Sequence, residues 1–359
     1  MTPKALISIL LYRSEKFLPE LLASLEQISY PHERLEIYFL DNAAGDKSGE
    51  LVQAFIPRFE KAGIKATLEI NKVNEGFAGG HNHAFHTALA EKIDYVYLLN
   101  SDAIVEPSFL TEAVAMAESN KNTAIVQSLI LLHPDTTKIN TIGNALHYLG
   151  FGYALGEREP ITALPRYEHF LEHSGYASGA GVLFRTEMLK TIGIFDDYMF
   201  LYHEDLDMSY RARLAGFDIR LAPHSIMYHR YEFSRSITKF YYMERNRFYV
   251  LLSVYRLWTI FLILPALLFV EAGLFIFSIT SGWWREKLRA YGHMLKPKTW
   301  LNILERRSEI KKLRRTSDRE MTKFFTSVIE SPELKNPTLL PILNKALSIY
   351  WQIIRRLII

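Results

Sequence analysis

The stretch 202-YHEDLDMSYRAR-213 places three carboxylates within four positions, next to a histidine and ahead of two arginines. A buried acidic cluster is costly unless it is paired, bound to a cation or used to move protons. The run that follows, 215-AGFDIRLAP-223, is typical of a helix stop and a short strand. We therefore expect the acids to open a helix at a strand edge, where active sites of layered α/β folds form.

Apolar runs with strand character alternate with helical patterns through the first part of the chain. The strand-like runs are 5–11, 35–40, 66–70, 95–99 and 123–127, and the segments with apolar spacing of three to four are 18–28, 47–62, 81–91 and 108–120. This alternation predicts βαβ units and an α/β fold with a mostly parallel, Rossmann-like sheet flanked by helices. Ligands of such sheets bind at the C-terminal ends of the strands.

The composition is that of a globular protein. With 359 residues, 49% hydrophobic and 23% charged, the chain suffices for one large domain with an appendage or for two domains. A net charge of +3 gives no indication of general nucleic-acid binding. The lack of cysteine excludes disulfides, thiolate catalysis and Cys-based zinc sites. The run 5–11 is short and has no small-residue cleavage site, so we expect a first strand and a cytoplasmic catalytic part.

The composition changes after about residue 235, which predicts a first domain over 1–235 and a helical region over 236–359. The run 257–279 is apolar and exceeds the ~20 residues that a spanning helix needs. Pro265 and Glu271 interrupt it, which favours a kinked hairpin lying in the membrane interface.

Further features of the helical region favour membrane attachment. Two tryptophans at 283–284 precede basic pairs in 306–315, a pattern that resembles an interfacial anchor. The final helix places one set of residues on a single apolar face: Leu340, Leu343, Leu347, Tyr350, Ile354 and Leu357. The alternative is a helical subdomain packed on the main domain or on a second subunit.

Two motifs indicate nucleotide binding near strand ends. Asp41 and Asn42 close the second strand-like run, where a carboxylate can accept from a nucleobase N–H or form an Asx turn. The loop 74-NEGFAGGHN-82 leads into a helix, and its glycines allow close approach to a nucleotide. Its position and spacing exclude the Gly-x-Gly-x-x-Gly fingerprint of dehydrogenases.

Two further motifs indicate metal binding and proton transfer. Asn100 and Asp102 lie on alternate residues at the end of the fourth run, so their oxygens can serve as two ligands of Mg²⁺ or Mn²⁺. A strand-terminating turn is the alternative. His229 ends a strand-like run and is a candidate third ligand. In the cluster 204–207, a carboxylate near a metal and a diphosphate can act as general base toward a hydroxyl.

Taken in order, these motifs resemble the family 2 glycosyltransferases of GT-A fold, and within them the rhamnosyltransferase-type branch. The resemblance covers about residues 4–255. It is carried by Asp41-Asn42, 74-NEGFAGGHN-82, 99-LNSD-102, 178-SGAG-181, 193-GIFD-196, 204-EDLD-207 and His229.

The resemblance implies roles for particular residues. Asp205 is the catalytic base, and Asp102 and His229 hold a divalent Mg²⁺ or Mn²⁺. Glu204 and Asp207 are expected to orient the base or to pair with arginines 211 and 213. The donor nucleotide sugar is expected to contact Asp41, Asn42, Asn74, Gly76, Phe77, Asn82, Asn100, Arg245 and Arg247. Two positions depart from the family pattern: Tyr12-Arg13 stands where Tyr-Asn is common, and Asn100 where others have Asp.

The expected activity is inverting transfer of a sugar, with rhamnose as a candidate, from a nucleotide-diphosphate sugar to a hydroxyl. The expected acceptor is a cell-surface or lipid-linked glycan, reached from the inner face of the cell membrane. Homo-oligomerisation through the C-terminal helices is a further option. A sugar-phosphate nucleotidyltransferase would need a basic glycine-rich loop after the first strand, where 12-YRSE-15 stands. A non-catalytic scaffold predicts loss of Asp102 or Asp205, and both are present.

Overall fold

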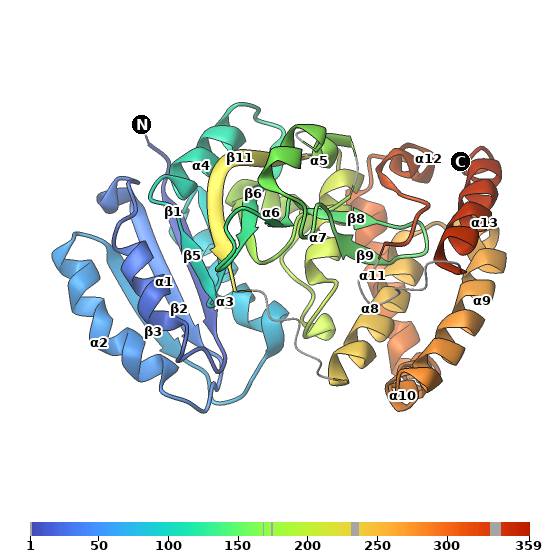
Figure 1. Cartoon of the computed structure of the whole chain (residues 1–359), viewed down its shortest axis with the longest axis horizontal. Helices are drawn as coiled ribbons and strands as arrows, with labels where there is room; N and C mark the ends of the chain where they lie inside the picture. Colours follow the sequence, from blue (N-terminus) through green and yellow to red (C-terminus); the bar gives the residue numbers. More distant parts are fainter. Residues whose placement is uncertain (1, 168, 174, 231–236, 331–338) are drawn as a thin grey trace.

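The computed structural model describes residues 2–167, 169–173, 175–230, 237–330 and 339–359 (Figure 1). Within these ranges nine strands form one sheet, in the order β3-β2-β1-β4-β10-β6-β11-β5 with β7 paired to β6, and β8 and β9 form a separate hairpin. The strands are β1 (Ala5–Leu11), β2 (Leu35–Asp41), β3 (Lys65–Ile70), β4 (Tyr95–Asn100), β5 (Ala103–Val105), β6 (Thr123–Leu132), β7 (Ile139–Thr141), β8 (Asn144–Leu146), β9 (Gly152–Ala154), β10 (Gly181–Arg185) and β11 (Asp218–His229).

Helices cover both faces of this sheet and form the far end of the molecule. The helices of the described ranges are α1 (Leu18–Leu25), α2 (Ser48–Lys61), α3 (Gly76–Glu91), α4 (Phe109–Glu118), α5 (Phe170–His173), α6 (Thr186–Ile192), α7 (Glu204–Leu214), α8 (Thr238–Val254), α9 (Leu257–Thr280), α10 (Trp284–Met294), α11 (Pro297–Leu313), α12 (Asp318–Met321) and α13 (Leu339–Ile354), with the short 3₁₀ turns η1 (His32–Arg34), η2 (Ile161–Arg166), η3 (Asp197–Met199) and η4 (Thr322–Phe324).

The predicted α/β class is confirmed. Strand β1 pairs in parallel with β2 and with β4, and β6 pairs in parallel with β11, whereas β10 runs antiparallel between β4 and β6. Alternate residues of β1 enter two cores: Ile7 packs with α1, α2 and α4, and Leu6 packs with α3, α6 and α7. A strand buried on both faces needs apolar residues at every position, which explains the continuous run in β1.

Helix α3 begins five residues earlier than its apolar pattern predicts, at Gly76. The glycines form its first turns because the chain approaches other groups closely there. Gly76 has φ +75°, and a Cβ on it would lie 2.2 Å from the carbonyl oxygen of Phe200. That oxygen accepts from the N–H of Phe77 at 2.6 Å. The loop motif therefore holds the chain just before α7 against the start of α3.

The C-terminal helices lie at the end of the molecule opposite β3, in the orange and red part of the chain (Figure 1). Their core includes Tyr148 and Leu149 near the β8–β9 hairpin, Tyr210 of α7, and Trp351 of α13. The helical region thus packs on the α/β part, as the alternative to membrane attachment expects. The predicted boundary near residue 235 lies outside the described residues.

The prediction of a kinked hairpin over 257–279 is wrong, because α9 is one continuous helix of 24 residues with Pro265 inside it. Glu271 does not interrupt its outer face, since its carboxylate bonds to Lys287 (2.7 Å) and Tyr291 (2.7 Å) and to Arg247 inside the protein. Within the described residues, α9 is the one helix long and apolar enough to cross a membrane.

The prediction that the basic segment 306–315 forms an exposed anchor is wrong for three of its arginines. Arg306 bonds to Asp207, Arg307 bonds to backbone carbonyls at the end of α8, and Arg314 bonds to Asp318. Carboxylates and carbonyl oxygens inside the protein therefore bind these guanidinium groups.

Candidate active site

The C-terminal ends of β2, β1 and β4 lie next to one another because these strands are parallel. In this register Asp41 is opposite Leu11, and Asn100 is opposite Leu10. The structure therefore brings the motif that follows β2 and the motif that follows β4 to one edge of the sheet, as expected from the strand order.

Asn42 shapes the loop that follows β3. Its side chain is 1% exposed. Its Nδ2 donates to Oδ1 of Asn74 at 3.1 Å and to the carbonyl of Gly76 at 2.9 Å, and its Oδ1 accepts from the N–H of Glu75 at 3.0 Å. Asn74 in turn accepts from the N–H of Gly76 at 2.8 Å. These bonds fix the glycine loop, so Asn42 positions the loop through buried hydrogen bonds.

Asp41 lies between two turns. Its Oδ1 accepts from the N–H of Ala44, three residues further along the chain, at 2.8 Å, so the carboxylate stabilises the turn after β2. A Cβ on Gly49, near the start of α2, would lie 2.6 Å from its Oδ2. The nucleobase contact of Asp41 stays a prediction.

Asp205 is half-buried at the second position of α7. Its Oδ2 accepts from the N–H of Gly179 at 3.0 Å, and its Oδ1 accepts from the N–H of Leu206 at 2.7 Å. Gly179 also lies against the ring of Phe77, because a Cβ there would be 3.1 Å from that ring. The base candidate and the glycine loop are therefore neighbours across Gly179.

Burial sets the charge of the two adjacent acids. It raises the pKa of Asp205 to about 6, which places its proton exchange near neutral pH. Glu204 is 5% exposed, and burial together with the neighbouring charge of Asp205 raises its pKa well above the ordinary value. Glu204 is therefore the protonated partner, and Asp205 is the carboxylate able to take up a proton.

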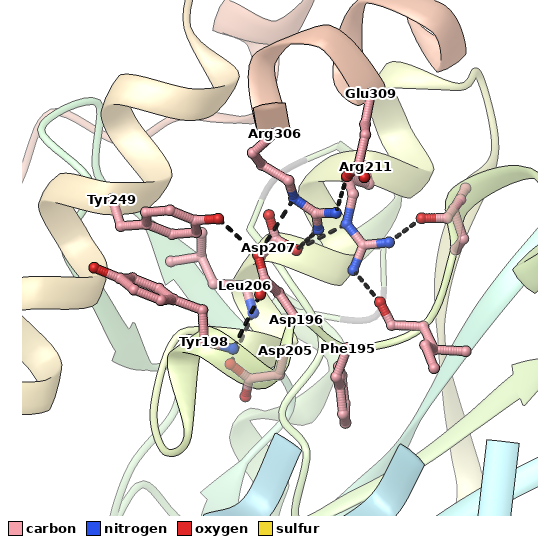
Figure 2. A network of polar contacts seen from close by, with 12 residues as sticks. Phe195, Asp196, Tyr198, Asp205, Leu206, Asp207, Arg211, Tyr249, Arg306 and Glu309 are labelled. Carbon is pink, nitrogen blue, oxygen red and sulfur yellow. Dashed lines mark hydrogen bonds and ion pairs between the residues drawn. The ribbon is translucent and has the colours of Figure 1, made fainter. Parts of the chain in front are cut away.

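The third acid, Asp207, differs from the other two because its pKa is lowered and not raised. Asp207 is 1% exposed, and its Oδ2 accepts from Nε of Arg211 at 2.8 Å and from Nη2 of Arg306 at 2.8 Å (Figure 2). Although burial acts to raise the pKa of Asp207, the two guanidinium groups outweigh it and lower that pKa. The expected pairing with Arg211 is confirmed. Arg213 instead donates to the carbonyl of Gly175 and lies over the ring of Phe324.

The proposed metal ligands come together from distant parts of the chain. Nε2 of His229, at the end of β11, lies 3.0 Å from Oδ1 of Asp102 and 3.2 Å from Nδ2 of Asn100. Nδ1 of His229 lies 2.9 Å from Oδ1 of Asn140 on β7. When Nδ1 carries the proton and donates to Asn140, Nε2 is unprotonated. Its lone pair is then available to a cation bound next to the Asp102 carboxylate.

This pair fits a divalent cation. Two adjacent ligands at ~2.1 Å from an octahedral cation lie about 3 Å apart, which is the spacing of the His229 and Asp102 atoms. Within the described ranges, however, no three His, Asp or Glu side chains gather as a metal site. Asp102 and His229 could therefore supply two ligands, beside the amide oxygen that the sequence proposes for Asn100. A cation that keeps waters and binds substrate phosphates needs no more.

Three predicted donor-site residues have their polar atoms committed to protein partners. Asn82 donates to the carbonyl of Phe195 at 3.0 Å and to Asp197 at 2.6 Å. Arg245 donates to the carbonyls of Tyr198 and Met199 at 2.7 and 2.8 Å. Arg247 is 1% exposed and bonds to Glu244 and Glu271. Arg245 thus holds the turn before α7, and Arg247 joins α8 to α9. The donor contact of both arginines stays a prediction.

Sequence reasoning missed Asn246, which holds the segment just before α7. Its Nδ2 lies 2.9, 2.9 and 2.7 Å from the carbonyl oxygens of Met199, Leu201 and Tyr202, which share its two N–H donors. In this segment Phe200, Tyr202 and His203 have φ of +61°, +67° and +73°, values that non-glycine residues rarely adopt. An asparagine that is fully buried in α8 was the available signal, although the sequence could not show its burial.

The family to which the chain belongs is shown by its similarity to known proteins. The model of the family described as glycosyltransferase like family 2 matches residues 3–250. The chain belongs to this family. Glucomannan 4-beta-mannosyltransferase 7 of Arabidopsis thaliana is 29% identical over 126 residues, which are 35% of this chain and 23% of that protein. The low-salt glycan biosynthesis hexosyltransferase Agl10 of Haloferax volcanii is 25% identical over 150 residues, 41% of this chain and 46% of that protein.

The chain thus matches less than half the length of these two relatives. They are a mannosyltransferase and a hexosyltransferase, so they do not support the rhamnosyltransferase-type branch. Mannosyltransferase PcManGT from Pyrobaculum calidifontis, solved with GDP-Man and Mn²⁺, has a TM-score of 0.54 at 16% identity and 87% coverage of each chain. S. aureus TarS 1-349, solved with UDP-GlcNAc, has a TM-score of 0.51 at 17% identity, and the match covers 98% of this chain and 90% of that chain. These likenesses show the GT-A fold.

Proposed function

We propose that this protein transfers a sugar from a nucleotide-diphosphate sugar to an acceptor hydroxyl with inversion, and that Asp205 is the base. The observation that carries the proposal is the Asp205 carboxylate, which two backbone N–H groups hold beside the glycine loop while burial raises its pKa to about 6. A carboxylate with this pKa is deprotonated at neutral pH and still accepts a proton readily.

In the proposed step the acceptor oxygen bonds to the anomeric carbon from the face opposite the leaving group. Its proton passes to Asp205, and the bond between the anomeric carbon and the diphosphate oxygen breaks to release a nucleoside diphosphate. Positioned base catalysis of this kind contributes ~10²–10⁴-fold in rate. The N–H groups of Gly179 and Leu206 orient the carboxylate before the acceptor arrives.

The donor site is proposed at the shared edge of β2, β1 and β4. Asp41 contacts the nucleobase, and Asn74, Gly76, Phe77 and Asn100 line the site, while Asn42 and Asn82 hold the loops around it. Because the curated relatives include mannosyltransferases, mannosyl donors are the first candidates and rhamnosyl donors the second.

We propose Asp102 and His229 as the protein ligands of Mg²⁺ or Mn²⁺. A cation bound there neutralises charge that develops on the departing diphosphate. The spacing of the two ligand atoms supports this assignment, and so does the Mn²⁺ in PcManGT.

We further propose that the acceptor is a cell-surface or lipid-linked glycan at the inner face of the cell membrane. Support comes from the apolar stripe of α9, which comprises exposed large side chains: Phe261, Leu264, Leu268, Phe269 and Ile276. The acid of this helix, Glu271, points inward to Lys287, so the stripe carries no charge. Exposed apolar faces of this extent are typical of membrane-surface helices.

A thermal-shift screen tests the donor assignment. Wild-type protein is heated with GDP-mannose, UDP-N-acetylglucosamine or dTDP-rhamnose, each with and without Mn²⁺. A true donor stabilises the fold by mass action, and Mn²⁺ should increase the shift. Asp205→Asn should retain the shift and lose release of the nucleoside diphosphate. The proposal falls if none of the three donors shifts the transition, or if the variant turns over like the wild type.

A further inference from the structure

A buried salt bridge joins the C-terminal helical region to the helix that carries the proposed base. Arg306 of α11 donates from Nη2 to Asp207 of α7 at 2.8 Å, and its side chain is 13% exposed. Figure 2 shows Arg306 reaching Asp207 from one side and Arg211 reaching it from another. We propose that Arg306 is a positioning residue for Asp205, so that α11 completes the active site. The inference rests on the proposed function.

The geometry links the two acids tightly. Asp207 stands two residues after Asp205, within the same helical turn. Leu206, between them, donates its N–H to Asp205. In Figure 2 the Asp205 carboxylate points away from the guanidinium groups, so Arg306 acts through the backbone of this turn and not by direct contact. Fixing Asp207 therefore fixes the direction of Asp205.

Arg306 also contacts the segment that leads into α7. Its Nε lies 3.7 Å from Oδ2 of Asp196, which accepts from the hydroxyl of Tyr249 in α8 at 2.8 Å. Oδ1 of Asp196 accepts from the N–H of Tyr198 at 3.0 Å. The same guanidinium thus lies between the first turn of α7 and the turn η3 that precedes it.

Arg211 alone cannot replace this link. It belongs to α7 itself, four residues after Asp207, and its other donors go to the carbonyls of Ile192 and Ile194. Arg211 thus joins α7 to the end of α6, whereas Arg306 joins the first turn of α7 to α11 in the C-terminal helical region. Arg306 lies beyond residues 3–250 that match the family model, so the family pattern does not include it.

Positioning predicts a loss of turnover without a loss of donor binding. Full-length Arg306→Met should release GDP from GDP-mannose with Mn²⁺ about 10–100-fold more slowly, with KM for the donor within about twofold, because small misplacements of a catalytic group reduce rate strongly. Arg306→Lys keeps the charge and should recover part of the rate. Lys311→Met, an exposed position on the same helix, is the control and should behave like the wild type.

Two further measurements separate positioning from simple unfolding and from failure of the proposed function. Titration with GDP and Mn²⁺ counts intact sites, so rates are compared per bound nucleotide. Amide hydrogen exchange across residues 204–208 should speed up in Arg306→Met and not in Lys311→Met. Unchanged exchange, or a rate per site equal to wild type, would overturn the proposal. If wild type turns over neither GDP-mannose nor the other donors, the proposed function fails, and the exchange result still decides the role of Arg306.

Discussion

Nε2 of His229 and Oδ1 of Asp102 lie 3.0 Å apart, although 127 residues separate them in the chain. Strand β5, which follows Asp102, pairs with the end of β11, where His229 lies opposite Ala103. The pairing of these two strands therefore creates the candidate metal site.

Removing this pair should remove the effect of the metal. We expect His229→Ala and Asp102→Asn to abolish Mn²⁺-dependent stabilisation by GDP, and Asn140→Ala to weaken the apparent Mn²⁺ affinity about 10–100-fold by freeing the histidine ring. Calorimetric titration of Mn²⁺ in the presence of GDP measures this. His224→Ala, an exposed histidine on the same strand, is the matched control. Wild-type affinity in His229→Ala would refute the site.

The pKa of Asp205 predicts an acidic limit to turnover. Because the base must be deprotonated and its pKa is about 6, kcat/KM should fall about tenfold per pH unit below that value. Initial rates of nucleotide release between pH 5 and 8 measure this acidic decrease in kcat/KM. Mn²⁺ is kept saturating at each pH so that loss of metal does not cause a similar decrease. A flat profile down to pH 5 would contradict the assignment.

The same shift predicts the stability of a variant. Burial raises the pKa of Asp205 from 3.8 in the unfolded chain to about 6 in the folded state. The folded protein is therefore most stable with respect to this group below pH 3.8, where it is protonated in both states, and it loses that stability as pH rises through 6. Asp205→Asn lacks this charge, so its free energy of unfolding should exceed that of the wild type by up to about 3 kcal/mol at pH 8, less what solvent screening removes, and the difference should vanish near pH 3.5. Urea unfolding at both pH values tests the sign. A variant less stable at pH 8 would be inconsistent with a buried charge.

The contacts of the Asn246 amide with three carbonyls predict a coupled loss of stability and turnover. Asn246→Ala leaves the carbonyls of Met199, Leu201 and Tyr202 without this donor, which should destabilise the fold by about 2–3 kcal/mol and reduce kcat. Chemical unfolding and nucleotide release give the two values. Asn122→Ala removes one exposed bond to a carbonyl and serves as control. Equal stability of the two variants would count against the role of Asn246.

The apolar stripe of α9 predicts binding to lipid vesicles. Replacing Phe261 and Phe269, which are 62% and 65% exposed, with glutamine should lower partition into anionic phosphatidylglycerol vesicles at least about tenfold. Flotation measures the bound fraction, and Ile70→Gln, an exposed apolar position on β3, is the control. Unchanged flotation would refute membrane binding by this stripe. A change from dimer to monomer would assign the stripe to a second copy of the chain.

Local pattern was sufficient for much of the fold. The apolar runs at 5–11, 35–40 and 95–99 became β1, β2 and β4 within one residue, because a strand buried on both faces needs apolar residues throughout. The start of α3 was missed, since the contact of Gly76 with Phe200 is formed between segments far apart in sequence.

Short apolar periods and motifs whose residues lie together were enough to predict most strands and helices of about the first 127 residues, the family, and the acids that gather at the sheet edge. They did not predict β5, β7 to β10, or the antiparallel insertion of β10 between β4 and β6. Only the tertiary structure decided what each charge touches. In the run 202-YHEDLDMSYRAR-213 it made Asp205 a half-buried carboxylate and paired Asp207 with Arg306, which lies 99 residues away. The partner of a buried charge is set by packing between distant segments, and no local spacing records it.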